Sequence, residues 1–216
     1  FNRIRCTIMP DIGSFVFLHQ ETTGLSGDFG TINVTEISFI ACSKLHFLNT
    51  TDGNIPRVLH KLTFCFNPQG SIATIASQIS GGLYNNLLER ESEFDNETAQ
   101  SILLFLKRLQ PPICLVAHNG NRFDFGLLKN KLKALETMLP DGTYCVDTLT
   151  FFRNVENIPN PPLGYFRLVN IYERYFHVPL EINAEEKAKA LLKCVIRHGP
   201  GFVQHAEMKC VEFNEI

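Results

Sequence analysis

Two short runs of consecutive apolar residues constrain the fold of this chain more than any other feature. The first lies within Ser14–Leu18 and the second covers Ile113–Ala117, and neither alternates apolar with polar residues. Such uninterrupted runs are typical of strands buried on both faces, in the middle of a sheet with helices on either side. Each run is followed at once by polar residues, so these two strand ends are the first places to look for chemistry.

The rest of the pattern predicts one α/β domain over residues 1–216, with a mixed five-stranded sheet flanked by helices. Thr31–Ser43 and Arg57–Asn67 predict two further, antiparallel strands, and Thr143–Val146 predicts the fifth. The helical spacing of apolar residues predicts helices at Asn96–Leu109, Phe123–Met138, Leu168–Phe176, Ala184–Arg197 and Phe202–Cys210, with short helices in Ser71–Leu88 and a proline-rich loop at Asn154–Gly164.

Composition excludes several classes of protein. Twenty Lys and Arg against 22 Asp and Glu give a net charge of −2, so a nucleic acid would have to be bound by a local, shaped site. No stretch approaches the length of an apolar membrane span, and we expect neither a membrane partner nor a secretory signal. The seven cysteines are odd in number and never closely paired, which favours reduced thiols in an intracellular protein, cytoplasmic or nuclear.

Both buried strands lead into segments that contain a carboxylate. Glu21 follows the first strand within Phe17–Leu25, where Thr-Thr-Gly would let a ligand approach the backbone. Asp124 lies in Leu115–Phe125, where the second strand ends in a polar turn and a helix begins. Taken alone, Asp124 also fits a plain negative charge in the first turn of a helix.

Taken together, the two segments resemble the motifs of the three-prime repair exonuclease (TREX) family, within the DnaQ-like DEDD exonucleases. Residues 20–25 resemble the first motif and 115–125 the middle motif, and Asp147, Leu168–Tyr172 and Ala184–Leu192 follow in the expected order over residues 13–205. The resemblance implies an RNase H-like fold and 3′→5′ exonuclease activity. In such enzymes four carboxylates hold two Mg²⁺ ions and a histidine activates the attacking water.

Three of the five catalytic positions implied by the resemblance are replaced. His19 stands where the family has its first Asp, and aligning the last motif puts Ile182 at the histidine and Lys187 at the final Asp. Only Glu21 and Asp124 remain, and an ammonium about 4 Å from Mg²⁺ would be repelled by roughly 8 kcal/mol at an effective dielectric of 20. We therefore expect a degenerate exonuclease with no metal cofactor, in which these two carboxylates bind Mg²⁺ or Mn²⁺ only if activity is retained.

Two alternatives keep a metal. An active enzyme with shifted ligands would use Glu181 and Glu186, which repeat the spacing of the last motif. The apolar stripe of the Ala184–Arg197 helix places Glu186 on a different side from the inward-facing Lys187, which argues against that shift. In the second alternative, His19, Glu21 and Asp124 bind a single transition metal, since a histidine with two carboxylates is a known ligand set.

The resemblance further implies a set of residues that would hold the terminal nucleotide. These positions are Thr22, Thr23, Leu25, Ile79, His118, Asn119, Arg122 and Phe123. Ordinary packing is the alternative for Leu25 and Ile79, whereas Arg122 precedes the retained carboxylate and would be placed to contact phosphate.

Three functions therefore remain open. The chain would bind single-stranded RNA or DNA without cutting it, act as a protein-interaction scaffold, or work as a Mg²⁺-dependent exonuclease with shifted ligands. In the first case Lys187 would draw the incoming backbone in place of the lost metal charge. The resemblance also implies a homodimer through a sheet edge at Arg57–Asn67, although the basic residues there could instead discourage strand pairing.

Overall fold

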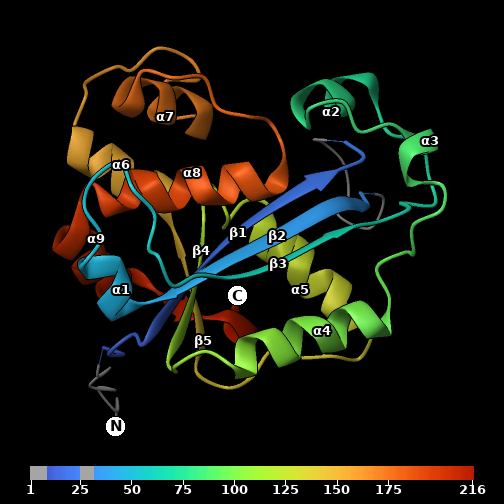
Figure 1. The fold of residues 1–216 in the computed structure, drawn as a ribbon, viewed down its shortest axis with the longest axis horizontal. Helices are drawn as coiled ribbons and strands as arrows, with labels where there is room; N and C mark the ends of the chain where they lie inside the picture. Colours follow the sequence, from blue (N-terminus) through green and yellow to red (C-terminus); the bar gives the residue numbers. More distant parts are fainter. Residues whose placement is uncertain (1–8, 25–31) are drawn as a thin grey trace, which may run out of the picture.

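A mixed sheet forms the centre of the computed structural model, which describes residues 9–24 and 32–216 (Figure 1). Within these residues the strand order is β3-β2-β1-β4-β5-β6. The neighbours β1, β4 and β5 are parallel, whereas β2, β3 and β6 each run antiparallel to the strand beside them. The strands are β1 Ser14–Thr22, β2 Val34–Ser43, β3 His60–Cys65, β4 Ile113–Ala117, β5 Thr143–Asp147 and β6 Val211–Glu212.

The five predicted strands are present, and β6 is the additional one. With two residues, β6 is too short to leave a periodic signal in the sequence. The two apolar runs form the central strands β1 and β4, and all five residues of β4 are buried. Side chains alternate across β1, so Phe15 and Phe17 enter one core cluster while Val16 and Leu18 enter the other.

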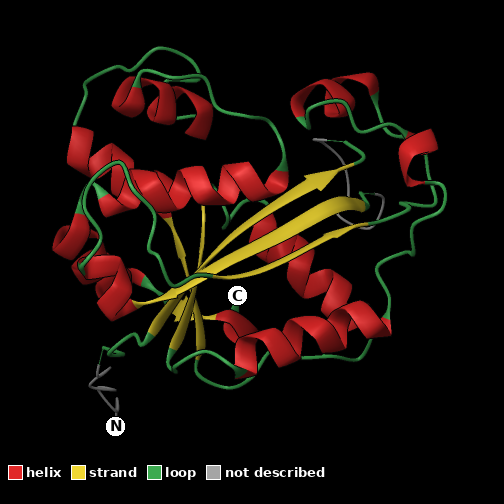
Figure 2. Cartoon of the chain, viewed as in Figure 1, coloured by secondary structure: helices red, strands yellow, loops and turns green. Residues whose placement is uncertain are grey.

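Helices cover both faces of the sheet (Figure 2). One face packs against α1, α6, α7, α8 and α9, and the opposite face packs against α4, α5 and the 3₁₀ helix η1. The helices are α1 Lys44–Leu48, α2 Thr74–Ile79, α3 Asn85–Leu88, α4 Asn96–Lys107, α5 Asp124–Ala134, α6 Thr148–Glu156, α7 Leu168–Phe176, α8 Ala184–Ile196, α9 Gly199–Lys209 and η1 Phe213–Glu215.

Helix boundaries show where the sequence prediction was wrong. Helix α5 ends at Ala134 and not at Met138, because the backbone reverses at Glu136 with a φ of 51° and the Thr137 N–H returns to the Leu132 carbonyl. Helix α6 was not predicted and takes up the first residues of the expected loop 154–164. It begins directly after β5 because the Asp147 carboxylate accepts the Leu149 N–H at 2.8 Å as an N-cap.

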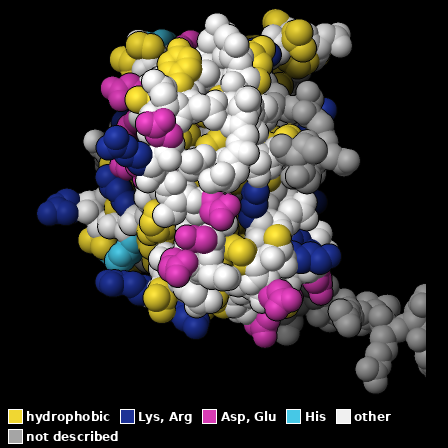
Figure 3. Space-filling view, turned by 90° about the vertical axis from the view of Figure 1, so that its right-hand side faces the viewer, with side chains coloured by type: hydrophobic (Ala, Val, Ile, Leu, Met, Phe, Trp, Pro, Cys, Tyr) yellow, Lys and Arg dark blue, Asp and Glu magenta, His cyan; other side chains and the backbone are white. Residues whose placement is uncertain are grey.

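The parallel arrangement brings the carboxyl ends of β1, β4 and β5 to one edge of the sheet. Helix α2 lies beside the tip of β1, and the first turn of α8 lies close to the same tip (Figure 1). Among the described residues, no helix is both long and apolar enough to cross a membrane. On the side shown in Figure 3, acidic and basic side chains are interspersed among the described residues, in agreement with the near-zero net charge.

Candidate functional site

Glu21 is the centre of a buried cluster of charged side chains at the tip of β1. Its Oε1 atom accepts a hydrogen bond of 2.5 Å from Nζ of Lys187, which lies in the first turn of α8. The Nε2 atom of His19 lies 3.3 Å from the same oxygen. Only 5% of the Glu21 side chain and 11% of the Lys187 side chain are exposed, so water screens this contact weakly.

The two basic neighbours keep Glu21 charged. Burial by itself would raise the pKa of the Glu21 carboxyl, but the hydrogen bond and charge of His19 and the charge of Lys187 outweigh it and lower that pKa. A carboxylate in the protein interior needs such a partner, because an unpaired buried charge is strongly unfavourable. Lys187 supplies it from within the chain.

Asp124, the second retained carboxylate, is fully buried at the start of α5. Its Oδ1 atom accepts the backbone N–H of Gln20 at 3.2 Å, and its backbone carbonyl accepts the Gln20 side-chain amide at 2.8 Å. Burial raises the pKa of Asp124 to about 6, although the charge of His19 and the bonds from Gln20 act in the opposite direction. Asp124 therefore joins α5 to β1 and is more easily protonated than an ordinary aspartate.

Glu36 is a third buried carboxylate in this cluster, and the sequence analysis missed it. It lies on β2 directly opposite Glu21 in the strand register. Its Oε2 atom accepts the backbone N–H of Ala184, the first residue of α8, at 2.9 Å. Burial raises the pKa of Glu36, the Ala184 bond lowers it, and nearby Glu21 raises it again. The available signal was that Glu36 is the one charged residue of β2, but only the register shows that it lies opposite Glu21.

His118, from the middle motif, is held at both ring nitrogens. Its Nε2 atom lies 2.7 Å from the Phe166 carbonyl, which can only accept, so this nitrogen carries the proton. Its Nδ1 atom lies 2.9 Å from the Thr148 hydroxyl. Burial lowers the pKa of His118, against the opposing effect of the Phe166 bond. His118 is therefore a neutral side chain that links β4 to the segment before α7.

Asp147 holds the turn that follows β4. Its two carboxylate oxygens accept the N–H groups of Asn119 and Asn121 at 2.8 and 3.1 Å. Asn119 has a left-handed backbone with a φ of 61°, and a Cβ atom on Gly120 would lie 2.7 Å from that of Ala117. The polar turn of the middle motif is thus fixed by β5, the next strand of the sheet.

The other residues of that turn face different surroundings. The Arg122 side chain is exposed, and among the described residues no carboxylate forms an ion pair with it. Phe123 is half-buried and packs against the core cluster on the α5 face. Arg122 is therefore open to solvent, whereas Phe123 contributes to packing.

Thr22 and Thr23 are engaged with the backbone around them. The Thr22 hydroxyl donates to the Gly24 carbonyl at 2.7 Å, and the Thr23 hydroxyl accepts the Asn33 N–H at 3.1 Å. Both residues are buried, so they shape the end of β1. Leu25, which the sequence also indicated, lies outside the described residues.

Ile79 contacts the buried Lys187, and Ile182 lies against the segment that follows Ile79. The Ile79 carbonyl accepts a hydrogen bond of 2.8 Å from Nζ of Lys187, while the residue remains 38% exposed. Ile182 is 41% exposed just before α8, and its backbone packs against Gly81 so closely that a Cβ there would lie 2.0 Å from the Ile182 carbonyl oxygen. Direct contacts thus join His19, Glu21, Ile79 and Lys187, whereas Ile182 meets the segment after α2 through Gly81.

Among the described residues, the alternative ligands Glu181 and Glu186 form no hydrogen bond or ion pair with Glu21 or Lys187. Glu181 is exposed, and the Glu186 carboxylate is 2.6 Å from the Lys189 ammonium on the same helix. Lys187 faces the sheet instead, as the apolar stripe of α8 predicts. The shifted-ligand arrangement therefore has no counterpart in these contacts.

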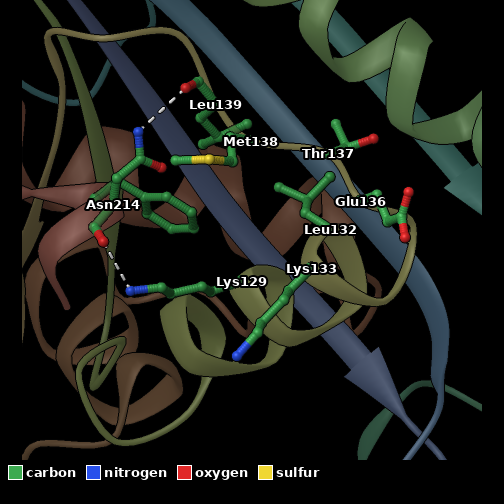
Figure 4. A pocket seen from close by; sticks show the side chains of 9 residues that line it. Lys129, Leu132, Lys133, Glu136, Thr137, Met138, Leu139 and Asn214 are labelled. Atoms are coloured by element: carbon green, nitrogen blue, oxygen red, sulfur yellow. Dashed lines mark hydrogen bonds between the residues drawn. The ribbon is translucent and has the colours of Figure 1, made fainter.

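A separate pocket of about 380 Å³ lies between the end of α5 and η1 (Figure 4). Lys129 donates to the Asn214 carbonyl at 2.9 Å, and the Asn214 side chain donates to the Leu139 carbonyl at 3.2 Å, so its main polar groups are engaged. None of the predicted site residues lines it. Its lining residues are Lys129, Leu132, Lys133, Glu136, Thr137, Met138, Leu139, Phe213 and Asn214.

Comparison with known proteins decides the family. No family model matches the chain. The chain is 31% identical over 211 residues to three prime repair exonuclease 2 of Mus musculus, covering 92% of this chain and 89% of that protein. The chain belongs to the three prime repair exonuclease family. Three-prime repair exonuclease 1 of Homo sapiens is 35% identical over 178 residues, covering 76% of this chain and 56% of that protein.

Solved structures confirm the RNase H-like fold of this three prime repair exonuclease family member. The nuclease domain of 3′hExo, a DEDDh family member bound to rAMP, superposes with a TM-score of 0.67 at 9% identity, covering 94% of this chain and 98% of that one. E. coli exonuclease I in complex with a 5cy-dA13 oligonucleotide gives a TM-score of 0.66 at 17% identity, covering 91% and 43%. At such identities the likeness concerns the fold.

The residues of this three prime repair exonuclease family member do not fit a pair of divalent ions at the motif positions. Among the described residues, no group of three or more His, Cys, Asp or Glu side chains is arranged to hold a metal. The position of the last acidic ligand instead carries the Lys187 ammonium, 2.5 Å from the Glu21 oxygen that would bind an ion. A cation at that oxygen would be repelled by the ammonium.

Proposed function

We propose that this protein binds the 3′ end of single-stranded nucleic acid, RNA or DNA, and does not hydrolyse it. The observation that carries the proposal is the contact between Lys187 and Glu21, in which an ammonium balances the carboxylate that the family uses for metal. The relatives support a 3′ end as the ligand, because their names describe three-prime exonucleases.

Hydrolysis also needs a base that activates water, and the position of that base carries a hydrocarbon. Ile182 has no atom that accepts a proton. His118, the histidine of the middle motif, uses both ring nitrogens in bonds to Phe166 and Thr148. These contacts favour binding over catalysis.

Binding groups are present where a strand would enter. Two of the three N–H donors of the Lys187 ammonium bond Glu21 and Ile79, and within the part of the chain that the structure describes the third is left for a phosphate oxygen. Arg122 is exposed beside the same strand ends and would add a second phosphate contact. Ile79, which is 38% exposed, offers an apolar surface to the terminal base.

Cleavage assays separate the binder from an active enzyme. Labelled single-stranded DNA and RNA are incubated with the wild type in Mg²⁺ or Mn²⁺, with Glu21→Gln as the matched variant and an active family member as positive control. We expect no shortening. Stepwise loss of 3′ nucleotides that Glu21→Gln abolishes would establish an active exonuclease instead.

Binding assays then separate the nucleic-acid binder from a protein scaffold. Fluorescence anisotropy with a single strand that has a free 3′ end is compared with a hairpin whose 3′ end is blocked, over a range of salt concentrations. We expect tighter binding to the free end and an affinity that falls with salt. Absence of binding to every oligonucleotide would leave the scaffold as the better explanation.

We also propose self-association through β3. This strand is at the edge of the sheet, next only to β2 among the described strands, and its residues are half-buried or exposed. The basic residue Lys61 on β3 is paired with Glu185 at 3.0 Å, so its charge opposes strand pairing less than a free lysine would. Light scattering of the wild type should report a dimer, and Lys61→Glu, which places two acids together, should shift it toward the monomer.

A further inference from the structure

Lys187 connects three elements that are far apart in the sequence. Its ammonium bonds Glu21 on β1 and the carbonyl of Ile79 at the end of α2, while its own backbone belongs to α8. We infer that Lys187 is a built-in cation that ties α2 to β1 and α8, so that the α2 side of the site is assembled without metal.

Helix α2 depends on few other contacts. It has six residues, of which only Ala76 and Ser77 are buried, and no side chain caps its start at Ala73. The Lys187 ammonium meets the carbonyl of its last residue, where the partial negative charge of a helix favours a cation. The close packing of Gly81 on Ile182 is the neighbouring contact between this segment and the chain before α8.

Glu36 fixes the position of Lys187. Its carboxylate binds the N–H of Ala184 at 2.9 Å, which ties the first residue of α8 to β2. Lys187 lies three residues later, one turn into the helix and on the side that faces β1. Glu36 is thus a positioning residue, because it sets the depth at which the ammonium enters the site.

The charges explain why metal would not be needed. A site with four carboxylates repels itself unless cations fill it, whereas here Lys187 and His19 already stand beside Glu21. A divalent ion could reach the same oxygen only by displacing the ammonium. The inference rests on the proposed function only in placing the ligand site around Lys187, and the contacts of Lys187 do not depend on a bound ligand.

Hydrogen exchange of the full chain tests the inference without using activity. We expect the amides of residues 74–82, and the Tm, to be unchanged by Mg²⁺, Mn²⁺ or a chelator. Lys187→Met should speed exchange in residues 74–82 by roughly tenfold or more, because a charge-assisted hydrogen bond to that segment is lost. Lys193→Met, also on α8 but without a hydrogen bond to α2 among the described residues, should leave that exchange unchanged.

A gain-of-metal variant provides the second arm. In the double variant His19→Asp with Lys187→Asp, adding Mn²⁺ should raise the Tm. It should also slow hydrogen exchange in residues 74–82, compared with the same variant without metal. If Lys187→Met fails to fold, Lys187→Gln, which keeps an uncharged amide donor group, replaces it. Slower wild-type exchange on adding Mn²⁺, or unchanged exchange in the Lys187 variants, would overturn the inference. If the wild type binds no oligonucleotide but the exchange results are as expected, the proposed function is overturned and the inference about Lys187 stands.

Discussion

The ammonium of Lys187 and the carboxylate of Glu21, 166 positions apart in the chain, meet at 2.5 Å in the interior of the molecule. His19 lies 3.3 Å from the same carboxylate oxygen. The buried carboxylate of Glu21 is thus balanced by basic side chains of the chain itself. Stability, pH dependence and ligand binding should all reflect that change.

Glu21→Gln should lower the free energy of unfolding by about 3–5 kcal/mol, because it leaves the Lys187 ammonium buried without its charged partner. Urea denaturation at neutral pH measures the effect. Glu21→Gln combined with Lys187→Met removes both charges and should recover part of the loss. A single variant as stable as the wild type would show that the pair contributes little.

Asp124→Asn should stabilise the protein at pH 7 by about 3 kcal/mol, because the folded-state pKa is about 6 against an ordinary value of 3.8. Burial penalises the ionised form, so the cost of Asp124 grows as pH rises through this interval and is complete above it. Near pH 3, where Asp124 is protonated in both the folded and the unfolded chain, the two proteins should be equally stable. Equal stability at both pH values would contradict the raised pKa.

His118→Gln should weaken the loss of stability on going from pH 7 to pH 5. Burial lowers the pKa of His118 in the folded state, so the unfolded chain takes up a proton first as pH falls below its ordinary value near 6.5. The stability that neutral His118 contributes is thus present above that pH and lost below it. Thermal unfolding at several pH values measures the slope, and an unchanged slope would argue against the prediction.

Gly81→Ala should cost about 1–3 kcal/mol of stability, because Gly81 has a φ of 76° and its new Cβ would lie 2.0 Å from the Ile182 carbonyl oxygen. It should also weaken oligonucleotide binding, since it pushes the turn after α2 away from Ile182, which precedes α8. Gly70→Ala is the matched control, because its Cβ would meet nothing closer than 3.8 Å. Similar melting temperatures for the two variants would refute the steric argument.

Arg122→Ala should weaken binding of single strands of every sequence and reduce the salt slope by about 1, as expected for one lost phosphate contact. Arg108→Ala, at the end of α4, is the control and should change neither quantity. Anisotropy titrations at several salt concentrations give both values. A loss that depends on the base sequence would mean that Arg122 reads a base and not the backbone.

Local patterns were sufficient for the framework of the site. The apolar runs of β1 and β4 predicted two central buried strands, and the stripe of α8 predicted that Lys187 faces inward while Glu186 does not. Periodicity failed at short elements such as β6, where two residues form no pattern. It also failed at α6, which a side-chain cap starts at Thr148 and which runs into the first residues of the expected loop 154–164.

The sequence by itself determined which residues stand at the family positions: His19, Glu21, Asp124, Ile182 and Lys187. Only the tertiary structure decided what those residues touch. That Glu36 faces Glu21 depends on the register of two strands, and that Lys187 reaches the Ile79 carbonyl depends on where α8 lies against the sheet. Contacts of this kind join distant parts of the chain through packing, and no local spacing of residues encodes them.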